Sequence, residues 1–236
     1  MKPLFTAFLA LGVACATGLA HSQATNPAGA PAQQPAAAAA GAGSATSIEA
    51  KVAMCMGCHN IRGYQASFPE VHKVPMIAGQ SAKYIAAALN AYKNGDRKHP
   101  TMRGIAVSLT EQDIATISGY YESLPKEVKP LGDKPGREPN AQVAGLLQKA
   151  ACASCHGANY SKPIDPSYPK LAGQHADYLF VALKAYKAEN NPAVGRNNGV
   201  MGAIAKQFSN AELKVIANYM ASLDSELRVH PEPRFR

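Results

Sequence analysis

An internal duplication constrains the fold of this chain more than any other sequence feature. The pentapeptide CMGCH at residues 55–59 recurs as CASCH at residues 152–156, 97 positions later. The stretch 78–93 recurs as 172–187, with ten of sixteen positions identical. Because two copies are fewer than the three or more that a stacked solenoid needs, we predict one domain copied in tandem.

Each copy shows the apolar periodicity of helices. Over residues 81–94, apolar side chains recur at helical spacing, and Gly95 stands where a helix is expected to end. Ser47 is suited to cap the first helix, and capping sequences at Thr110 and Ser209 begin the last helix of each copy. No stretch alternates polar and apolar residues as a half-buried strand does. We therefore predict three helices in each copy and an all-α fold.

The N-terminus has the pattern of a secretory signal peptide. Lys2 precedes an apolar run over residues 4–20, and the small residues Ser22 and Ala24 favour cleavage after Ala24. Residues 1–24 are therefore predicted to direct export and to be removed, which places the mature chain in the periplasm. The alternative is an uncleaved anchor that associates the protein with the membrane, because the run approaches the roughly 17–25 apolar residues that span a bilayer.

Composition marks two segments that are predicted to lack a core. Residues 25–46 contain ten Ala, three Pro and no charged side chain, so they are expected to form a flexible tether. Four prolines within residues 125–140 are expected to end a helix and to keep this linker between the copies extended. The two copies then occupy residues 47–124 and 141–236.

The charge distribution argues against a nucleic-acid partner. Lys and Arg exceed Asp and Glu by 24 to 16, a formal net charge of +8, but the positive charges are spread along the chain. No stretch forms the dense basic run that is typical of a nucleic-acid-binding arm. Electrostatic steering of partners is therefore expected to be modest and to be weakened by salt.

The duplicated pentapeptide is the attachment sequence for a c-type haem. In C-x-x-C-H, two thiols add across the porphyrin vinyl groups and the adjacent His ligates the iron. A zinc ribbon would place its cysteine pairs about 15–20 residues apart, and a thioredoxin-like site would follow a strand, so neither fits. Two covalently bound haem c groups are therefore predicted. The attachment residues are Cys55, Cys58 and His59 in the first copy and Cys152, Cys155 and His156 in the second.

A haem iron held by one His needs a second axial ligand, and methionine is the candidate that both copies share. Met102 and Met201 lie 43 and 45 residues after His59 and His156, each shortly before the last helix. A thioether ligand favours ferrous iron and so raises the reduction potential. Histidine is the competitor, and His99 is the strongest alternative ligand, although it has no histidine counterpart in the second copy.

Taken in order, the motifs resemble the di-haem cytochrome c4 family. C-x-x-C-H is followed by P-x-[IL]-A-G-Q, a Tyr-bearing helix, a Met and a final helix, twice within residues 47–225. The resemblance implies two tandem class I cytochrome c domains, each an all-α shell around one covalent haem c. It also implies the iron ligands and the proline carbonyl groups that accept hydrogen bonds from the imidazoles. These are His59, Met102 and Pro75 for the first haem, and His156, Met201 and Pro169 for the second.

With both axial positions filled, neither iron offers an open site for oxygen or peroxide. We therefore predict a periplasmic electron carrier rather than an enzyme. Its partners would be redox proteins, a respiratory donor and a terminal oxidase or reductase. Two alternatives remain open: a cytochrome subunit of a larger dehydrogenase or oxidase complex, and a di-haem peroxidase in which one iron ligand is displaceable.

Overall fold

The computed structural model describes residues 47–124 and 130–231, which we call the first half and the second half. The predicted signal peptide (1–24), the predicted tether (25–46) and the first five residues of the predicted linker lie outside the described residues. Both halves belong to one compact unit.

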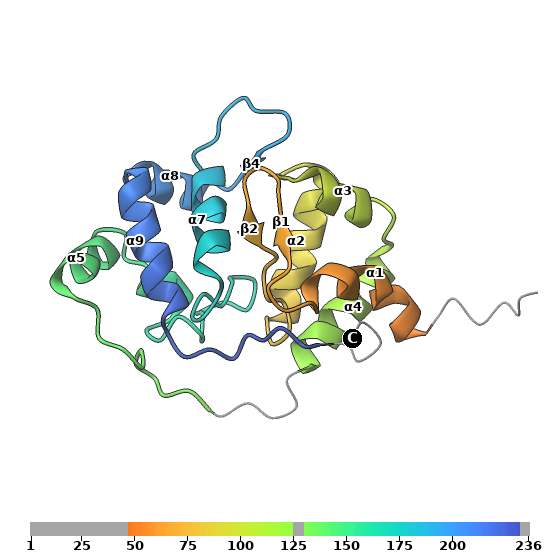
Figure 1. The fold of residues 1–236 in the computed structure, drawn as a ribbon, viewed down its shortest axis with the longest axis horizontal. Helices are drawn as coiled ribbons and strands as arrows, with labels where there is room; N and C mark the ends of the chain where they lie inside the picture. Colours follow the sequence, from red (N-terminus) through yellow and green to blue (C-terminus); the bar gives the residue numbers. More distant parts are fainter. Residues whose placement is uncertain (1–46, 125–129, 232–236) are drawn as a thin grey trace, which may run out of the picture. The chain divides into compact units, whose positions relative to one another are not determined.

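The first half is built from helices joined by short strand pairs. Its helices are α1 (Ile48–His59), α2 (Ala82–Asn94), α3 (Pro100–Ala106) and α4 (Glu111–Ser123), and its strands are β1 (Gln65–Ala66), β2 (His72–Lys73) and β3 (Arg97–Lys98) (Figure 1). β1 and β2 pair antiparallel, with Ala66 opposite His72. α4 packs against both α1 and α2. The apolar faces of these helices meet in one core that contains Val52, Ile85 and Ile117.

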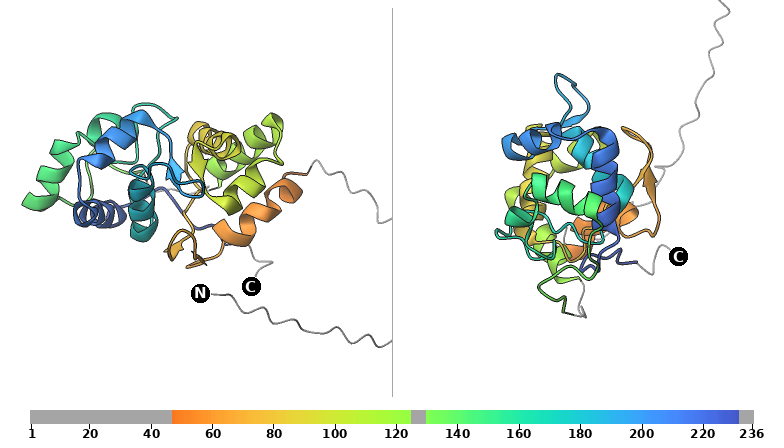
Figure 2. Two further views of the ribbon diagram at one scale, coloured as in Figure 1. Left: turned by 90° about the horizontal axis from the view of Figure 1, so that it is seen from above. Right: turned by 90° about the vertical axis from the view of Figure 1, so that its left-hand side faces the viewer.

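The second half repeats this arrangement around a core of its own. Its helices are α5 (Ala141–Lys149), α6 (Ala153–His156), α7 (Ala176–Ala185), α8 (Gly199–Lys206) and α9 (Asn210–Ala221), and its strand is β4 (Gly195–Arg196). α9 packs against α5 and lies beside α7 (Figures 1 and 2). The apolar stripe of α9 is buried through Leu213, Ile216 and Met220. Each half therefore surrounds a separate hydrophobic core.

The all-α class predicted from the sequence is confirmed, because every element longer than two residues in the described part of the chain is a helix. The periodicity does not predict α3, α6 and α8, which span only seven, four and eight residues. The predicted first helix of the second copy is interrupted between α5 and α6, where Ala151 has a φ of 48°. Two-residue strands are too short to show the alternation that identifies a strand.

The helix ends follow the capping residues of the sequence. Ser47 caps α1 by accepting a hydrogen bond from the N–H of Ala50. Gly95 ends α2 with a φ of 88°, a left-handed conformation that glycine adopts without steric cost. Thr110 and Ser209 form complete capping boxes at the starts of α4 and α9. The predicted helix starts and the predicted stop are thus confirmed.

Replacing Ser209 with alanine is expected to destabilise the haem-loaded protein by about 1 kcal/mol. The Ser209 hydroxyl accepts from the N–H of Glu212 at 3.2 Å, and the substitution removes that acceptor. Urea unfolding followed by circular dichroism measures the change. Ser67→Ala is the control, because Ser67 is exposed in a loop and should change stability by less than about 0.5 kcal/mol. Equal losses in the two variants would contradict the capping role.

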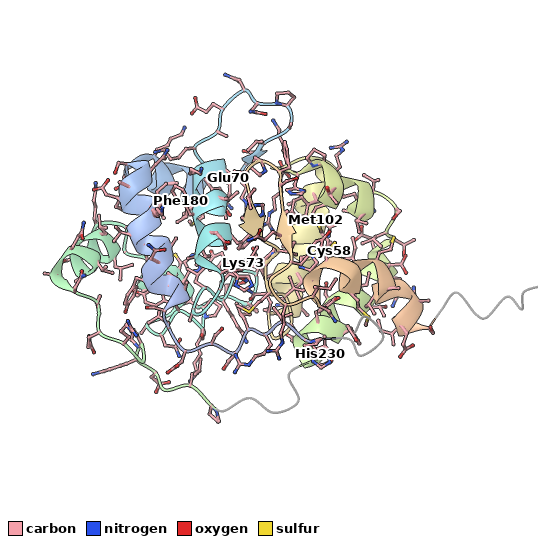
Figure 3. The ribbon with its side chains drawn as sticks, in the orientation of Figure 1. Cys58, Glu70, Lys73, Met102, Phe180 and His230 are labelled. Carbon is pink, nitrogen blue, oxygen red and sulfur yellow. The ribbon has the colours of Figure 1, made fainter. Side chains whose placement is uncertain are left out.

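Hydrogen bonds between distant residues connect the two halves. β3 pairs antiparallel with β4, with Arg97 opposite Arg196. The backbone N–H of Lys73 in β2 donates to Oδ2 of Asp177 in α7 at 3.0 Å, and Lys73 is labelled beside α7 in Figure 3. Residues about a hundred positions apart are therefore held in direct contact.

Candidate haem sites

Each cysteine pair lies on a helical turn. Cys55 and Cys58 are on α1, where residues three positions apart face the same side of the helix. Cys152 and Cys155 lie on the turn that begins α6. None of these four cysteines forms a disulfide, and all four are of intermediate burial. The spacing therefore presents both thiols of a pair to one partner, as addition to two vinyl groups requires.

Burial keeps the first thiol of each pair protonated. It raises the pKa of Cys55 to about 11 and raises the pKa of Cys152 above its ordinary value. A redox-active C-x-x-C site depends instead on a cysteine whose pKa is lowered. The first cysteine of each pair therefore does not have the lowered pKa of a thioredoxin-like nucleophile.

The two motif histidines each have one ring nitrogen engaged. Nδ1 of His59 lies 2.8 Å from the carbonyl oxygen of Pro75, and Nδ1 of His156 lies 3.0 Å from that of Pro169. Because a carbonyl oxygen only accepts, Nδ1 carries the proton and Nε2 keeps a lone pair for a metal. Burial lowers the pKa of both imidazoles by more than these hydrogen bonds raise it, so both are neutral at pH 7.

The two candidate methionines lie on the short helices α3 and α8. The N–H of Met102 donates to Nδ1 of His99 at 3.4 Å, and the N–H of Met201 donates to Oδ1 of Asn198 at 2.9 Å. Met102 and Cys58 are both labelled in Figure 3. His99, the alternative ligand, is thus the N-cap of the helix that carries Met102, and Asn198 takes the same position in the second half. The sequence comparison of the copies missed this correspondence because the two residue types differ.

The predicted residues converge on one continuous cavity of about 440 Å³. Its walls contain the four motif cysteines, both motif histidines, both candidate methionines and the two prolines. Most of the remaining lining is apolar and comes largely from α2, α7 and α9, including Ile85, Leu89, Leu179, Leu183 and Ile216. An apolar cavity that also presents imidazole and thioether groups matches the surroundings of a haem iron.

Two arginines outside the predicted set also line this cavity. Arg97 is only 9% exposed and donates to the hydroxyl oxygens of Tyr84 at 3.5 Å and Tyr178 at 3.3 Å, while its Nε has no partner. Arg196 donates to Tyr178 at 3.1 Å and lies over the ring of Tyr186. Both arginines precede the methionine of their copy by five residues. That shared spacing is the sequence signal that could have identified them.

The arginine pair creates an excess of positive charge in the cavity. Within the described ranges, neither guanidinium forms an ion pair with an acidic side chain. Burial acts to raise the pKa of Tyr178, but the charges of Arg196 and Arg97 outweigh it and lower that pKa to about 8. A haem carries two carboxylate side chains, which would supply the missing negative charge. The residues therefore fit both the apolar and the charged parts of a haem.

Comparisons with known proteins place this chain among cytochromes. The protein-family model described as cytochrome c matches residues 141–224. A thiosulfate dehydrogenase electron acceptor from Stutzerimonas stutzeri is 30% identical, over 71% of this chain and 79% of its own length. Cytochrome c4 from Pseudomonas aeruginosa is 28% identical, over 94% of this chain and 98% of its own.

This chain belongs to the cytochrome c4 family. The crystal structure of reduced recombinant cytochrome c4 from Pseudomonas stutzeri matches the fold with a TM-score of 0.55 and 25% identity, covering 78% of this chain and 100% of that one. Membership of the cytochrome c4 family, together with two C-x-x-C-H motifs, implies two covalently bound haem c groups. Membership of this family also identifies the chain as a di-haem electron carrier rather than an enzyme. The predicted haem cofactors and the predicted carrier role are therefore confirmed.

Among the helices of residues 47–124 and 130–231, none is both long enough and apolar enough to cross a bilayer. The N-terminal segment, for which the sequence offers a cleaved signal peptide or an uncleaved anchor, lies outside these ranges.

Proposed function

We propose that this cytochrome carries single electrons in the periplasm from a respiratory donor to a terminal oxidase or reductase. The observation that carries the proposal is the similarity to cytochrome c4 over 94% of the chain, with a C-x-x-C-H motif in each copy. The periplasmic location rests on the predicted signal peptide at residues 1–24.

We propose His59 and Met102 as the ligands of the first iron, and His156 and Met201 as those of the second, with the four motif cysteines as attachment points. When bound, each haem supplies an iron that exchanges one electron between its ferrous and ferric states. The chain would hold both candidate ligands in place, because each imidazole is fixed by a proline carbonyl and each methionine lies on an N-capped helix. With an imidazole and a thioether both bound, each iron would have no site left for oxygen or peroxide.

The charged end of the cofactor has its own candidate partners. Arg97 and Arg196 meet where β3 pairs with β4, so both halves contribute to one patch of positive charge. The unpartnered Nε of Arg97 leaves at least one donor available. We propose that these guanidinium groups hold haem carboxylates, since charge-assisted hydrogen bonds offset the cost of a buried cation.

We propose the predicted boundaries for the two haem domains, residues 47–124 and 141–236, with a linker at 125–140. The separate hydrophobic core of each half supports this division. The described part of the linker, residues 130–140, packs against the rest of the second half, because Tyr219 donates to the carbonyl of Arg137 at 2.8 Å and Asn159 donates to that of Gly132 at 2.6 Å.

A thiosulfate-oxidising enzyme is the donor class that the comparisons favour. One relative, 30% identical, is named a thiosulfate dehydrogenase electron acceptor, and a second protein of that name from Thiomonas intermedia is 27% identical. A dehydrogenase of this kind would release electrons one at a time to a carrier whose two haems can each take one.

Stopped-flow mixing of the oxidised, haem-loaded protein with a thiosulfate dehydrogenase and thiosulfate tests the donor directly. Rapid reduction of both haems, followed by reoxidation with a purified terminal oxidase, is the expected result. Reduction by a different respiratory dehydrogenase alone would retain the carrier role and reject this donor. Sustained peroxide turnover by the isolated protein would favour a peroxidase, and isolation only within a large complex would favour a bound cytochrome subunit.

A further inference from the structure

The glutamine that ends each A-G-Q motif reaches into the opposite half. Gln80 and Gln174 occupy equivalent positions in the two copies. They are 3% and 4% exposed, among the most buried polar side chains of the described residues. Neither the haem attachment motifs nor the candidate iron ligands require them, so their burial calls for a separate explanation.

Each glutamine amide makes two hydrogen bonds with a single backbone residue across the interface. Oε1 of Gln174 accepts from the N–H of Met76 at 3.0 Å, and its Nε2 donates to the carbonyl of Met76 at 2.8 Å. Oε1 of Gln80 accepts from the N–H of Lys170 at 3.0 Å, and its Nε2 donates to the carbonyl of Lys170 at 3.1 Å. The two contacts are reciprocal, since each half supplies one amide and one backbone partner.

Each backbone N–H that donates to a glutamine across the interface belongs to the same peptide group as the carbonyl that binds a motif histidine. The N–H of Met76 and the carbonyl of Pro75 belong to one planar peptide group, and that carbonyl accepts from His59. In the second half, the N–H of Lys170 and the carbonyl of Pro169 share a peptide group in the same way, with His156 as the donor. Each glutamine therefore binds one end of the peptide group whose other end binds a histidine.

Hydrogen bonds at the two ends of one peptide group strengthen each other. An acceptor on the N–H polarises the peptide and makes its carbonyl oxygen a better acceptor. A planar group anchored at the N–H is also restricted in its rotation, so the carbonyl keeps its direction toward the imidazole. The strength of the His59 contact thus depends on Gln174, and the strength of the His156 contact depends on Gln80.

We propose that Gln80 and Gln174 are positioning residues that act crosswise, each setting from one half the hydrogen bond on the histidine iron ligand of the other half. The inference rests on the ligand assignment proposed above. Its consequence is that the reduction potential of each haem is tuned by a residue of the opposite domain.

The direction of the effect follows from ligand basicity. A stronger hydrogen bond from Nδ1–H makes the imidazole a more basic ligand, which stabilises ferric iron and lowers the reduction potential. Gln174→Leu removes the polarising contact at Met76 and is expected to raise the potential of the first haem. Gln80→Leu is expected to raise that of the second haem. Leucine keeps most of the side-chain volume, so packing changes little.

A stepwise redox titration followed by NMR of the haem methyl groups assigns a potential to each half of the intact di-haem protein. The expected result is crosswise, with Gln80→Leu shifting the second haem more than the first and Gln174→Leu shifting the first more than the second. Gln148→Ala, an exposed position on α5, is the control and should shift neither haem. A larger shift in the haem of the substituted half, equal shifts in both haems, or no shift would overturn the proposal.

Amide hydrogen exchange in the fully reduced protein provides an independent measurement. The N–H of Lys170 should exchange faster in Gln80→Leu and the N–H of Met76 should exchange faster in Gln174→Leu, each by tenfold or more. If the leucine variants do not fold, the alanine variants, in which water has room to enter, test the same crosswise pattern. Unchanged exchange at both amides would overturn the proposal.

Failure of the ligand assignment is recognised separately in the unsubstituted protein. Two low-spin haems with the weak near-infrared band of methionine-ligated ferric haem are expected before any substitution is made. Absence of that band would reject the methionine ligands without bearing on the crosswise shifts, because those depend on the histidine side of each iron.

Discussion

Replacing Met102 with alanine is expected to lower the reduction potential of the first haem by on the order of 0.1 V or more, with little change in the second. Axial ligands set haem potentials over a range of roughly 0.8 V, and the soft thioether accounts for part of the preference for ferrous iron. Met102 packs against the core of the first half only, so its loss should act locally. A spectroelectrochemical titration that resolves both haems measures the two potentials.

Two companion variants make the Met102 experiment decisive. Val107→Ala is the control, because Val107 directly follows α3 in the same half, is 51% exposed, does not line the cavity and should leave both potentials unchanged. His99→Ala tests the competing ligand. If His99 bound the first iron, His99→Ala would produce the large change in potential and Met102→Ala would not. That outcome would reverse the assignment and would leave α3 as a purely structural helix.

Replacing Cys55 and Cys58 together with alanine is expected to remove one haem and to unfold the first half. Without the haem, the apolar side chains that line the cavity in this half would surround an unfilled or hydrated space, and an unfilled space costs ~24 cal/mol per Å³. Because a small domain has a total stability of only about 5–15 kcal/mol, the loss of the haem is expected to remove much of it. Intact-mass measurement should show one haem per chain, and far-UV circular dichroism should show a partial loss of helix.

The reciprocal variant, with alanine at Cys152 and Cys155, is the control for that experiment. It should keep the haem and the helices of the first half and lose those of the second, because each half has its own hydrophobic core. Loss of both haems from either double variant would contradict independent haem domains. Full helical content with only one haem bound would contradict the structural role of the cofactor.

The local features of this protein were predictable because their physical causes are local. Attachment of two thiols and one imidazole to a haem requires a fixed spacing, so C-x-x-C-H marks Cys55, Cys58 and His59 as the candidate attachment residues without any knowledge of the fold. A helix cap depends on residues three positions apart, so Thr110 and Ser209 mark the starts of α4 and α9. The short helices α3 and α8 were not predicted from the sequence, because seven or eight residues are too few to show helical periodicity.

The sequence by itself determined the duplication and the helical class, and it indicated the candidate haem attachment points and ligands, because all of these depend on spacing along the chain. Only the tertiary structure decided what the copies do to each other. Arg97 meets Tyr178 of the other half, and Gln174 meets the backbone of Met76, 98 positions away. Such pairs leave no local pattern, because their partners are set by how two folded domains pack rather than by neighbours along the chain.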